Sequence, residues 1–170
     1  MASSIGARPA GARPDHRNAD RAHDRGRTPA QLYGLVFGAV LLIVGLLGFI
    51  SDSSFDTGTS GLNGDSLLGF EVNGWHNLVH VGSGLFLLLM CAKRATAKTA
   101  ALLFGLVYGL VTIVGFVDGQ DVFGLIPVNQ ADNFLHLAIS ALALLTGLIS
   151  PGRDREREVA RTTAAGRRPA

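Results

Sequence analysis

Four long apolar segments, separated by polar ones, set the pattern of this chain. No Lys, Arg, Asp or Glu occurs in residues 28–51, 72–92, 99–117 and 133–152. A bilayer core about 30 Å thick is spanned by roughly 20 apolar residues of helix, so each segment is long enough to cross it. A helix of a soluble bundle would instead carry a charged stripe on its outward face. The pattern predicts an all-α, integral membrane four-helix bundle, with helices at about residues 29–51, 74–92, 99–117 and 133–150.

The two ends of the chain differ in composition from this domain. Residues 1–27 hold six Arg and three Asp, and residues 153–170 hold six Arg and three acidic residues, with few large apolar side chains. Such segments cannot bury enough surface to offset the entropy of ordering them. We expect two disordered cytoplasmic tails around a transmembrane domain at residues 28–152. The interleaved acidic residues and the lack of aromatic residues argue against nucleic-acid binding.

Charge predicts the orientation of the chain in the membrane. All 15 Lys and Arg lie in the two tails or in the connection at residues 93–98. The loops at residues 52–71 and 118–132 hold seven acidic residues and no basic one. Basic residues mark the cytoplasmic side of a membrane protein. We therefore expect a multi-pass protein of the cell (plasma) membrane with both termini in the cytoplasm.

The apolar segments form two similar pairs. The stretch YGLVFGAV from Tyr33 aligns with FGLVYGLV from Phe104, and the motif V-N-x-x-[HD]-N-x-x-H occurs at residues 72–80 and again at 128–136. We interpret the domain as two tandem two-helix repeats, related by an axis along the membrane normal. Glycines four residues apart allow helix backbones to approach closely in lipid. The glycines expected to pack helices, paired by this alignment, are Gly34 with Gly105 and Gly38 with Gly109.

The repeated motif gathers hydrogen-bonding side chains beside long apolar helices. Asn73 and Asn129 stand where a helix needs an N-cap, a position that asparagine favours. At 3.6 residues per turn, the Asn and His that follow each N-cap fall on the same stripe of the helix. The polar cluster predicted at the external end of the bundle comprises Asn73, His76, Asn77, His80, Asn129, Asp132, Asn133 and His136.

A structural role is our leading interpretation of this cluster. An unpaired polar group inside a membrane costs several kcal/mol. Hydrogen bonds from Asn77 to His136 and from Asn133 to His80, across the axis between the repeats, would satisfy these groups. The chain has neither a nucleotide-binding glycine loop nor a serine nucleophile elbow, so we expect a non-enzymatic protein with no cofactor.

Two other functions stay open. Histidine titrates near neutral pH, and acidic loops concentrate cations, which suits a proton or cation transport or coupling protein. Alternatively, the weak metal-ligand candidates His76, His80, Asp132 and His136 suit zinc or a related ion. His80 opposite His136 suits a haem held from two sides. Neither an H-E-x-x-H nor a C-x-x-C motif supports a metal site, so none is assigned.

The stretches EVNGWHNLVHVGSGL from Glu71 and GLIPVNQADNFLHLAISALALLTG from Gly124 resemble a known family. It is the bacterial, mainly actinobacterial, four-helix membrane family catalogued as domain of unknown function 4383. The resemblance covers about residues 33–150 and implies a small integral membrane protein without an assigned activity. The expected partners are the lipid bilayer and either a second copy of the chain or another membrane protein.

Overall fold

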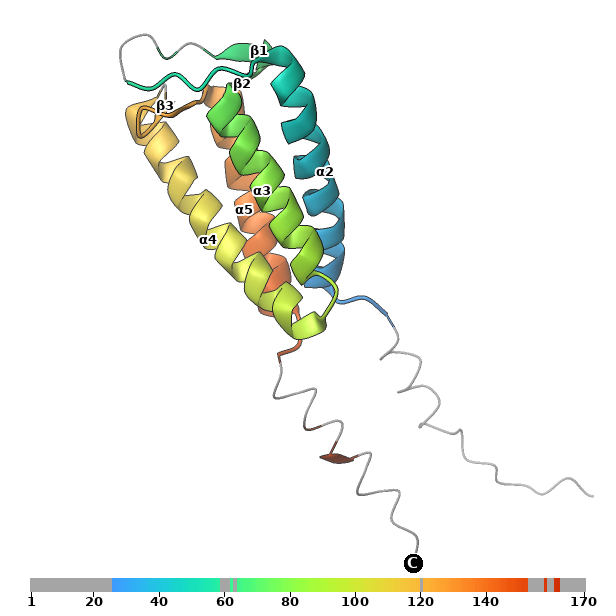
Figure 1. Ribbon diagram of the computed structural model, residues 1–170. Helices are drawn as coiled ribbons and strands as arrows, with labels where there is room; N and C mark the ends of the chain where they lie inside the picture. The colour runs from blue at the N-terminus through green and yellow to red at the C-terminus, as the bar shows by residue number, and fades with distance from the viewer. Residues whose placement is uncertain are drawn as a thin grey trace, which may run out of the picture.

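The computed structural model describes residues 26–58, 62, 64–119, 121–152, 158 and 161–162. Within these residues a bundle forms from the helices α2 (Pro29–Ser51), α3 (Gly74–Met90), α4 (Arg94–Asp118) and α5 (Gln130–Ile149). The four helices lie side by side along a common direction (Figure 1). The predicted all-α membrane bundle is confirmed. The predicted tails, residues 1–27 and 153–170, lie almost wholly outside the described residues.

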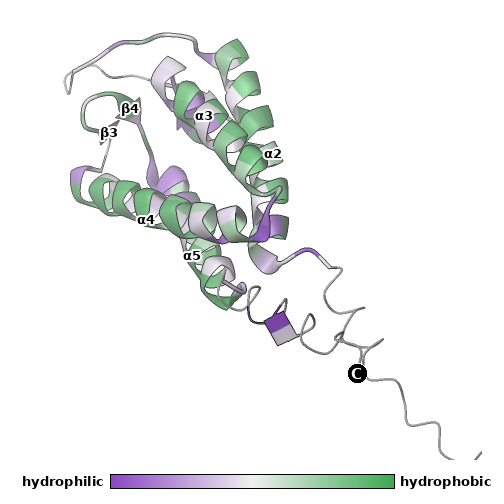
Figure 2. Ribbon diagram, turned by 60° about the horizontal axis from the view of Figure 1, so that its bottom comes forward, coloured by the Kyte–Doolittle hydropathy of each residue, from purple (hydrophilic) through white to green (hydrophobic). Residues whose placement is uncertain are grey.

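The outer surface of the bundle is suited to lipid. In the described part of the chain, three helices are long and apolar enough to cross a membrane, namely α2, α4 and α5. Helix α3 has 17 residues, which is the lower end of the length that spans a bilayer core. Large apolar side chains point outward along the helices, and Figure 2 shows hydrophilic residues mainly at helix ends and connections.

Three helix ends differ from the predicted ones by two residues or more. Helix α4 begins at Arg94 rather than residue 99, and α5 begins at Gln130 rather than residue 133. Helix α3 ends at Met90, two residues before the predicted end. The prediction placed the α4 and α5 boundaries at the last charged residue before each apolar segment. Long basic side chains on a terminal turn can still reach water, and an acidic residue near a helix N-terminus is favourable, so both helices extend past those charges.

The loops before α3 and before α5 each contain a short β hairpin that the sequence pattern did not predict. Strands β1 (Asp65–Leu67) and β2 (Phe70–Val72) pair antiparallel, as do β3 (Asp121–Val122) and β4 (Ile126–Pro127). Each turn contains a bulky residue and a glycine with positive φ, Leu68-Gly69 in one and Phe123-Gly124 in the other. The usual signal for such turns is Asn-Gly or Asp-Gly. Because Leu68 and Phe123 stand where that signal has asparagine or aspartate, the sequence pattern indicated neither turn.

Glycines bring the helices together in two pairs, α2 with α3 and α4 with α5. A Cβ at Gly38 would lie 2.9 Å from Leu88 Cγ, and one at Gly105 would lie 2.7 Å from Leu144 Cγ. Near the end of the bundle that carries the β hairpins, a Cβ at Gly48 would overlap the side chain of Asn77, and one at Gly115 that of Asn133. Small residues thus allow close backbone approach within each pair, as expected in lipid.

These contacts correct the predicted glycine pairing by one helical turn. Leu88 and Leu144 occupy corresponding positions 56 residues apart, and they contact Gly38 and Gly105. Gly38 therefore corresponds to Gly105, whereas the sequence alignment had paired it with Gly109. A Cβ at Gly109 would meet only Ser140 Oγ, at 3.9 Å. Helices α2 and α4 both carry glycines four residues apart. Their sequences can therefore be aligned in two registers that differ by one helical turn.

The two helix pairs pack against each other around a buried core, and hydrogen bonds join one pair to the other. Between them, Tyr33, Leu41, Leu87, Phe104, Tyr108, Ile139 and Ala143 form an apolar cluster. The Tyr33 hydroxyl donates to the Ile139 carbonyl at 2.9 Å, so one hairpin is bonded to the other inside this core. At the end of the bundle where α2 begins, Ala30 N donates to Ser150 Oγ at 2.9 Å. The start of α2 and the end of α5 are therefore neighbours.

Gly48→Ala and Gly115→Ala are each expected to lower the free energy of unfolding by about 1–3 kcal/mol, because the added methyl group must displace an asparagine side chain. Thermal melting in detergent, followed by circular dichroism, measures the loss. Gly82→Ala is the matched control, since a Cβ there has nothing within 4 Å. Equal melting temperatures for Gly48→Ala and Gly82→Ala would show that the close approach is not needed.

Candidate functional site

Asparagine N-caps begin both helices of the polar cluster. Asn73 Oδ1 accepts from His76 N at 2.9 Å, and Asn129 Oδ1 accepts from Asp132 N at 3.0 Å. The predicted N-caps are confirmed. The Asp132 carboxylate accepts in return from Asn129 N at 3.0 Å, which completes a capping box. Each side chain satisfies backbone N–H groups that a helix start leaves free.

The same two asparagines also join the halves of the molecule. Asn73 Nδ2 donates to the Leu125 carbonyl at 2.8 Å, and Asn129 Nδ2 donates to the Gly69 carbonyl at 2.9 Å. Each acceptor lies four residues before the opposite N-cap, so the two bonds correspond to each other. A third bond between the halves runs from Glu71 N to Asp132 Oδ2 at 3.0 Å. Together these three bonds form what we call the external joint, because the charge pattern of the sequence predicts that this end of the bundle faces outward.

The predicted bonds between asparagine and histidine are wrong. Asn77 Nδ2 donates instead to the Asp52 carbonyl at 2.8 Å, and Asn77 Oδ1 has no partner among the described residues. Both ring nitrogens of His80 and the Oδ1 of Asn133 also lack partners in this part of the chain. The helical-stripe argument failed because Asn77 and Asn133 face the glycines of their own hairpin rather than the opposite half.

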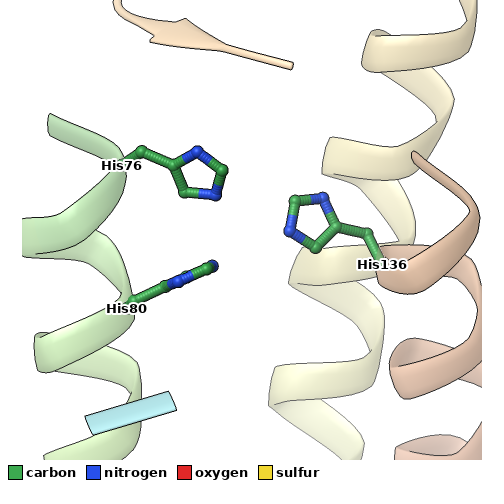
Figure 3. A group of neighbouring side chains, drawn as sticks. All are labelled: His76, His80 and His136. Atoms are coloured by element: carbon green, nitrogen blue, oxygen red, sulfur yellow. The ribbon is translucent and has the colours of Figure 1, made fainter. Parts of the chain in front are cut away.

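Three histidines meet between the two hairpins. Figure 3 shows His76 and His80 pointing from α3 toward His136, which points back from α5. The ring centroids of His76 and His80 lie 4.4 Å apart, and that of His136 lies 5.8 Å from His76 and 6.1 Å from His80. The exposed fractions are only 2%, 8% and 4% for His76, His80 and His136. The three side chains form one buried group, which we call the histidine cluster.

Most nitrogens of the histidine cluster have no hydrogen-bond partner. Among the described residues these are His76 Nε2, both nitrogens of His80, and His136 Nδ1. Leaving a buried polar group unpartnered costs roughly 1–3 kcal/mol. These nitrogens are therefore available to a water molecule or to a ligand that interacts with several imidazoles at once.

One histidine has a fixed orientation and tautomer. His76 Nδ1 lies 2.7 Å from the Glu71 carbonyl, which can only accept a hydrogen bond. Nδ1 therefore carries the proton, and a neutral His76 presents the lone pair of Nε2 to the other two rings. The Glu71 carboxyl lies nearby on β2, and burial followed by the negative charge of Asp132 raises its pKa.

The structure places six of the eight predicted polar residues in two groups, whereas Asn77 and Asn133 pack against glycines of their own hairpins. The side chains of Asn73, Asn129 and Asp132 serve the external joint, and Asp132 is not part of the histidine cluster. The other three ligand candidates, His76, His80 and His136, lie together in the histidine cluster. Sequence analysis did not predict the acceptors at Gly69 and Leu125, because every residue has a backbone carbonyl and the residue type does not show which one accepts a bond.

A haem does not fit between His80 and His136. The His76 ring lies beside both of them, edge-on to His80 with planes 71° apart. Tyr108 packs edge-on against His136 with a centroid distance of 5.5 Å. These rings fill the space that a porphyrin between the two axial ligands would need.

Comparison with known proteins identifies the family but no activity. The model of the family described as domain of unknown function (DUF4383) matches residues 31–149. No curated protein and no solved structure matches the chain.

Asn73→Ala is expected to lower the free energy of unfolding by about 1–3 kcal/mol, since it removes a helix cap and a bond between the halves. Asn73→Ser keeps a capping oxygen but lacks the amide donor, so about 0.5–1.5 kcal/mol should be lost. The same pair of changes at Asn129 should give matching values in thermal or denaturant melting. Serine variants as stable as the unchanged protein at both positions would show that the bonds to Leu125 and Gly69 contribute nothing.

Proposed function

The chain belongs to the DUF4383 family, and we propose that it is a non-enzymatic, four-pass protein of a bacterial plasma membrane whose external joint fixes two helical hairpins against each other. The observation that carries this proposal is the reciprocal pair of bonds, Asn73 to Leu125 and Asn129 to Gly69. Each hairpin caps its own helix and reaches into the loop of the other with the same side chain. Loss of either hairpin would leave buried polar groups without partners.

Charge and helix order support four crossings with both termini in the cytoplasm. Helix α3 connects an acidic loop to the basic connection before α4, although it is shorter than the other helices. Placing these two flanks on opposite sides of the membrane satisfies the preference of basic residues for the cytoplasm. The charge-free apolar length of α3 then lies in the bilayer core, where its exposed Leu89 contacts lipid.

Corresponding contacts support an origin by duplication of one hairpin. Asn77 packs on Gly48, and Asn133 packs on Gly115. Both asparagines follow an N-cap by four residues, and both N-caps follow a β hairpin. The same set of local interactions therefore recurs in the two halves, even where the residue types differ, as with His76 and Asp132.

Cation binding is a second candidate function. It is favoured by the unpartnered imidazole nitrogens of the histidine cluster, which lie at the acidic end of the bundle. The external loops hold seven acidic residues and no basic one. Surfaces with one sign of charge raise the local concentration of counter-ions.

Cysteine labelling tests the proposed topology. In a Cys91→Ala background, Ser66→Cys on β1 should react with a membrane-impermeant maleimide in intact spheroplasts, because the external loops face outward. Ala92→Cys, in the connection after α3, should react only after permeabilisation. Both positions are exposed at the protein surface, so accessibility depends on the membrane alone. Labelling of both sites from outside would mean that α3 does not cross, and a reversed pattern would invert the orientation.

A further inference from the structure

We propose that His76, His80 and His136 bind one divalent transition-metal ion of the zinc class, held between the two hairpins. This goes beyond the external joint, which consists of other side chains. Each of the three histidines offers a ring nitrogen, and these nitrogens all lie within 4.8 Å of one another. Two come from α3 and one from α5, so a bound ion would link the first hairpin to the second.

The spacing of the nitrogens suits a shared ion. At the centre of a triangle with 4.8 Å sides, an ion is about 2.8 Å from each nitrogen, whereas zinc–nitrogen bonds are about 2.0–2.1 Å. Each imidazole therefore needs to move inward by less than about 1 Å, which a small side-chain rotation provides. Three protein ligands leave the fourth tetrahedral position for a water molecule or another small ligand.

The protonation of the cluster favours a cation over an anion or a proton donor. His76 Nδ1–H is held by the Glu71 carbonyl, which leaves Nε2 with its lone pair toward the cluster. A metal-ligating histidine commonly donates its other ring N–H to a carbonyl or carboxylate in this way, and this bond orients the ring. His80 has no competing partner for either nitrogen among the described residues.

The surroundings select the class of ion. Imidazole nitrogen suits zinc, cobalt, nickel and copper, whereas calcium and magnesium prefer oxygen ligands. The nearest candidate oxygen ligand from sequence, the Asp132 carboxylate, is instead bonded to Asn129 N and Glu71 N. Tyr108 covers one side of His136 with its ring. The site is therefore rich in nitrogen and poor in competing carboxylates.

The route to the site also favours a cation. Glu71 lies beside Asp132 at the external joint, next to the carbonyl that holds His76. The acidic loops around it contain no basic residue. A positive ion approaching from outside would meet attractive charge until it reaches the three neutral imidazoles.

Metal binding to the full-length chain tests the proposal. The protein should carry a histidine-free affinity tag and the changes His16→Ala and His23→Ala, so that of its five histidines only the cluster remains. After removal of metal with EDTA and incubation with Zn²⁺ in detergent, elemental analysis of the desalted protein should give about one zinc per chain. Zn²⁺ should also raise the melting temperature, and Co²⁺ should give the intense visible bands of a tetrahedral site.

Single variants assign the ligands. His76→Ala, His80→Ala and His136→Ala should each lower zinc affinity at least about 100-fold, the upper end of the loss caused by removing an orienting partner. Cys91→Ala is the control and should keep full affinity, because Cys91 lies at the other end of α3. If a histidine variant does not fold, the Co²⁺ spectrum of the protein with an intact cluster still shows whether the ion is bound in a tetrahedral site. The proposal is overturned by no retained zinc, by zinc retained in all three variants, by an octahedral Co²⁺ spectrum, or by binding of Ca²⁺ or Mg²⁺ in place of zinc.

Discussion

The need to satisfy backbone groups at the N-terminal ends of α3 and α5 governs this structure. Helix starts leave N–H groups free, and the hairpin turns before these helices leave carbonyls free. Asn73 and Asn129 meet both needs, because an amide side chain can accept through its oxygen and donate through its nitrogen. Neither serine nor aspartate could replace both functions. The packing of the hairpins and the position of the histidines follow from where these two residues are fixed.

The sequence predicted the helices well because their physical signal is long and redundant. The absence of charge over about 20 residues marks a membrane segment whatever its detailed order. The N-caps were also predictable, since asparagine before an apolar helix has a specific role. The β hairpins were not, because Leu68 and Phe123 adopt positive φ where the usual signal is asparagine or aspartate.

The candidate site was predictable in content but not in arrangement. The eight polar residues do gather at one end of the bundle, yet a spacing argument could not say which face each one takes. Asn77 and His80 are three residues apart, which was close enough to predict a shared stripe. In the structure the side chain of Asn77 packs against Gly48 on the neighbouring helix, whereas His80 faces the other hairpin. The face that each side chain takes depends on the helix packed against it, and the motif by itself does not show which residues of that helix lie opposite.

The contact between Ala30 and Ser150 makes the bundle a closed ring of hairpins. The start of α2 lies beside the end of α5, at the same end of the bundle as the connection between α3 and α4. The order of the two hairpins along the chain is therefore not fixed by their contacts. A circular permutant beginning at α4 and ending at α3 would contain the same interfaces, the same joint and the same three imidazoles. Two separate chains, each with one hairpin, could assemble the same bundle. The covalent connection therefore raises the effective concentration of one hairpin near the other but does not determine how they pack.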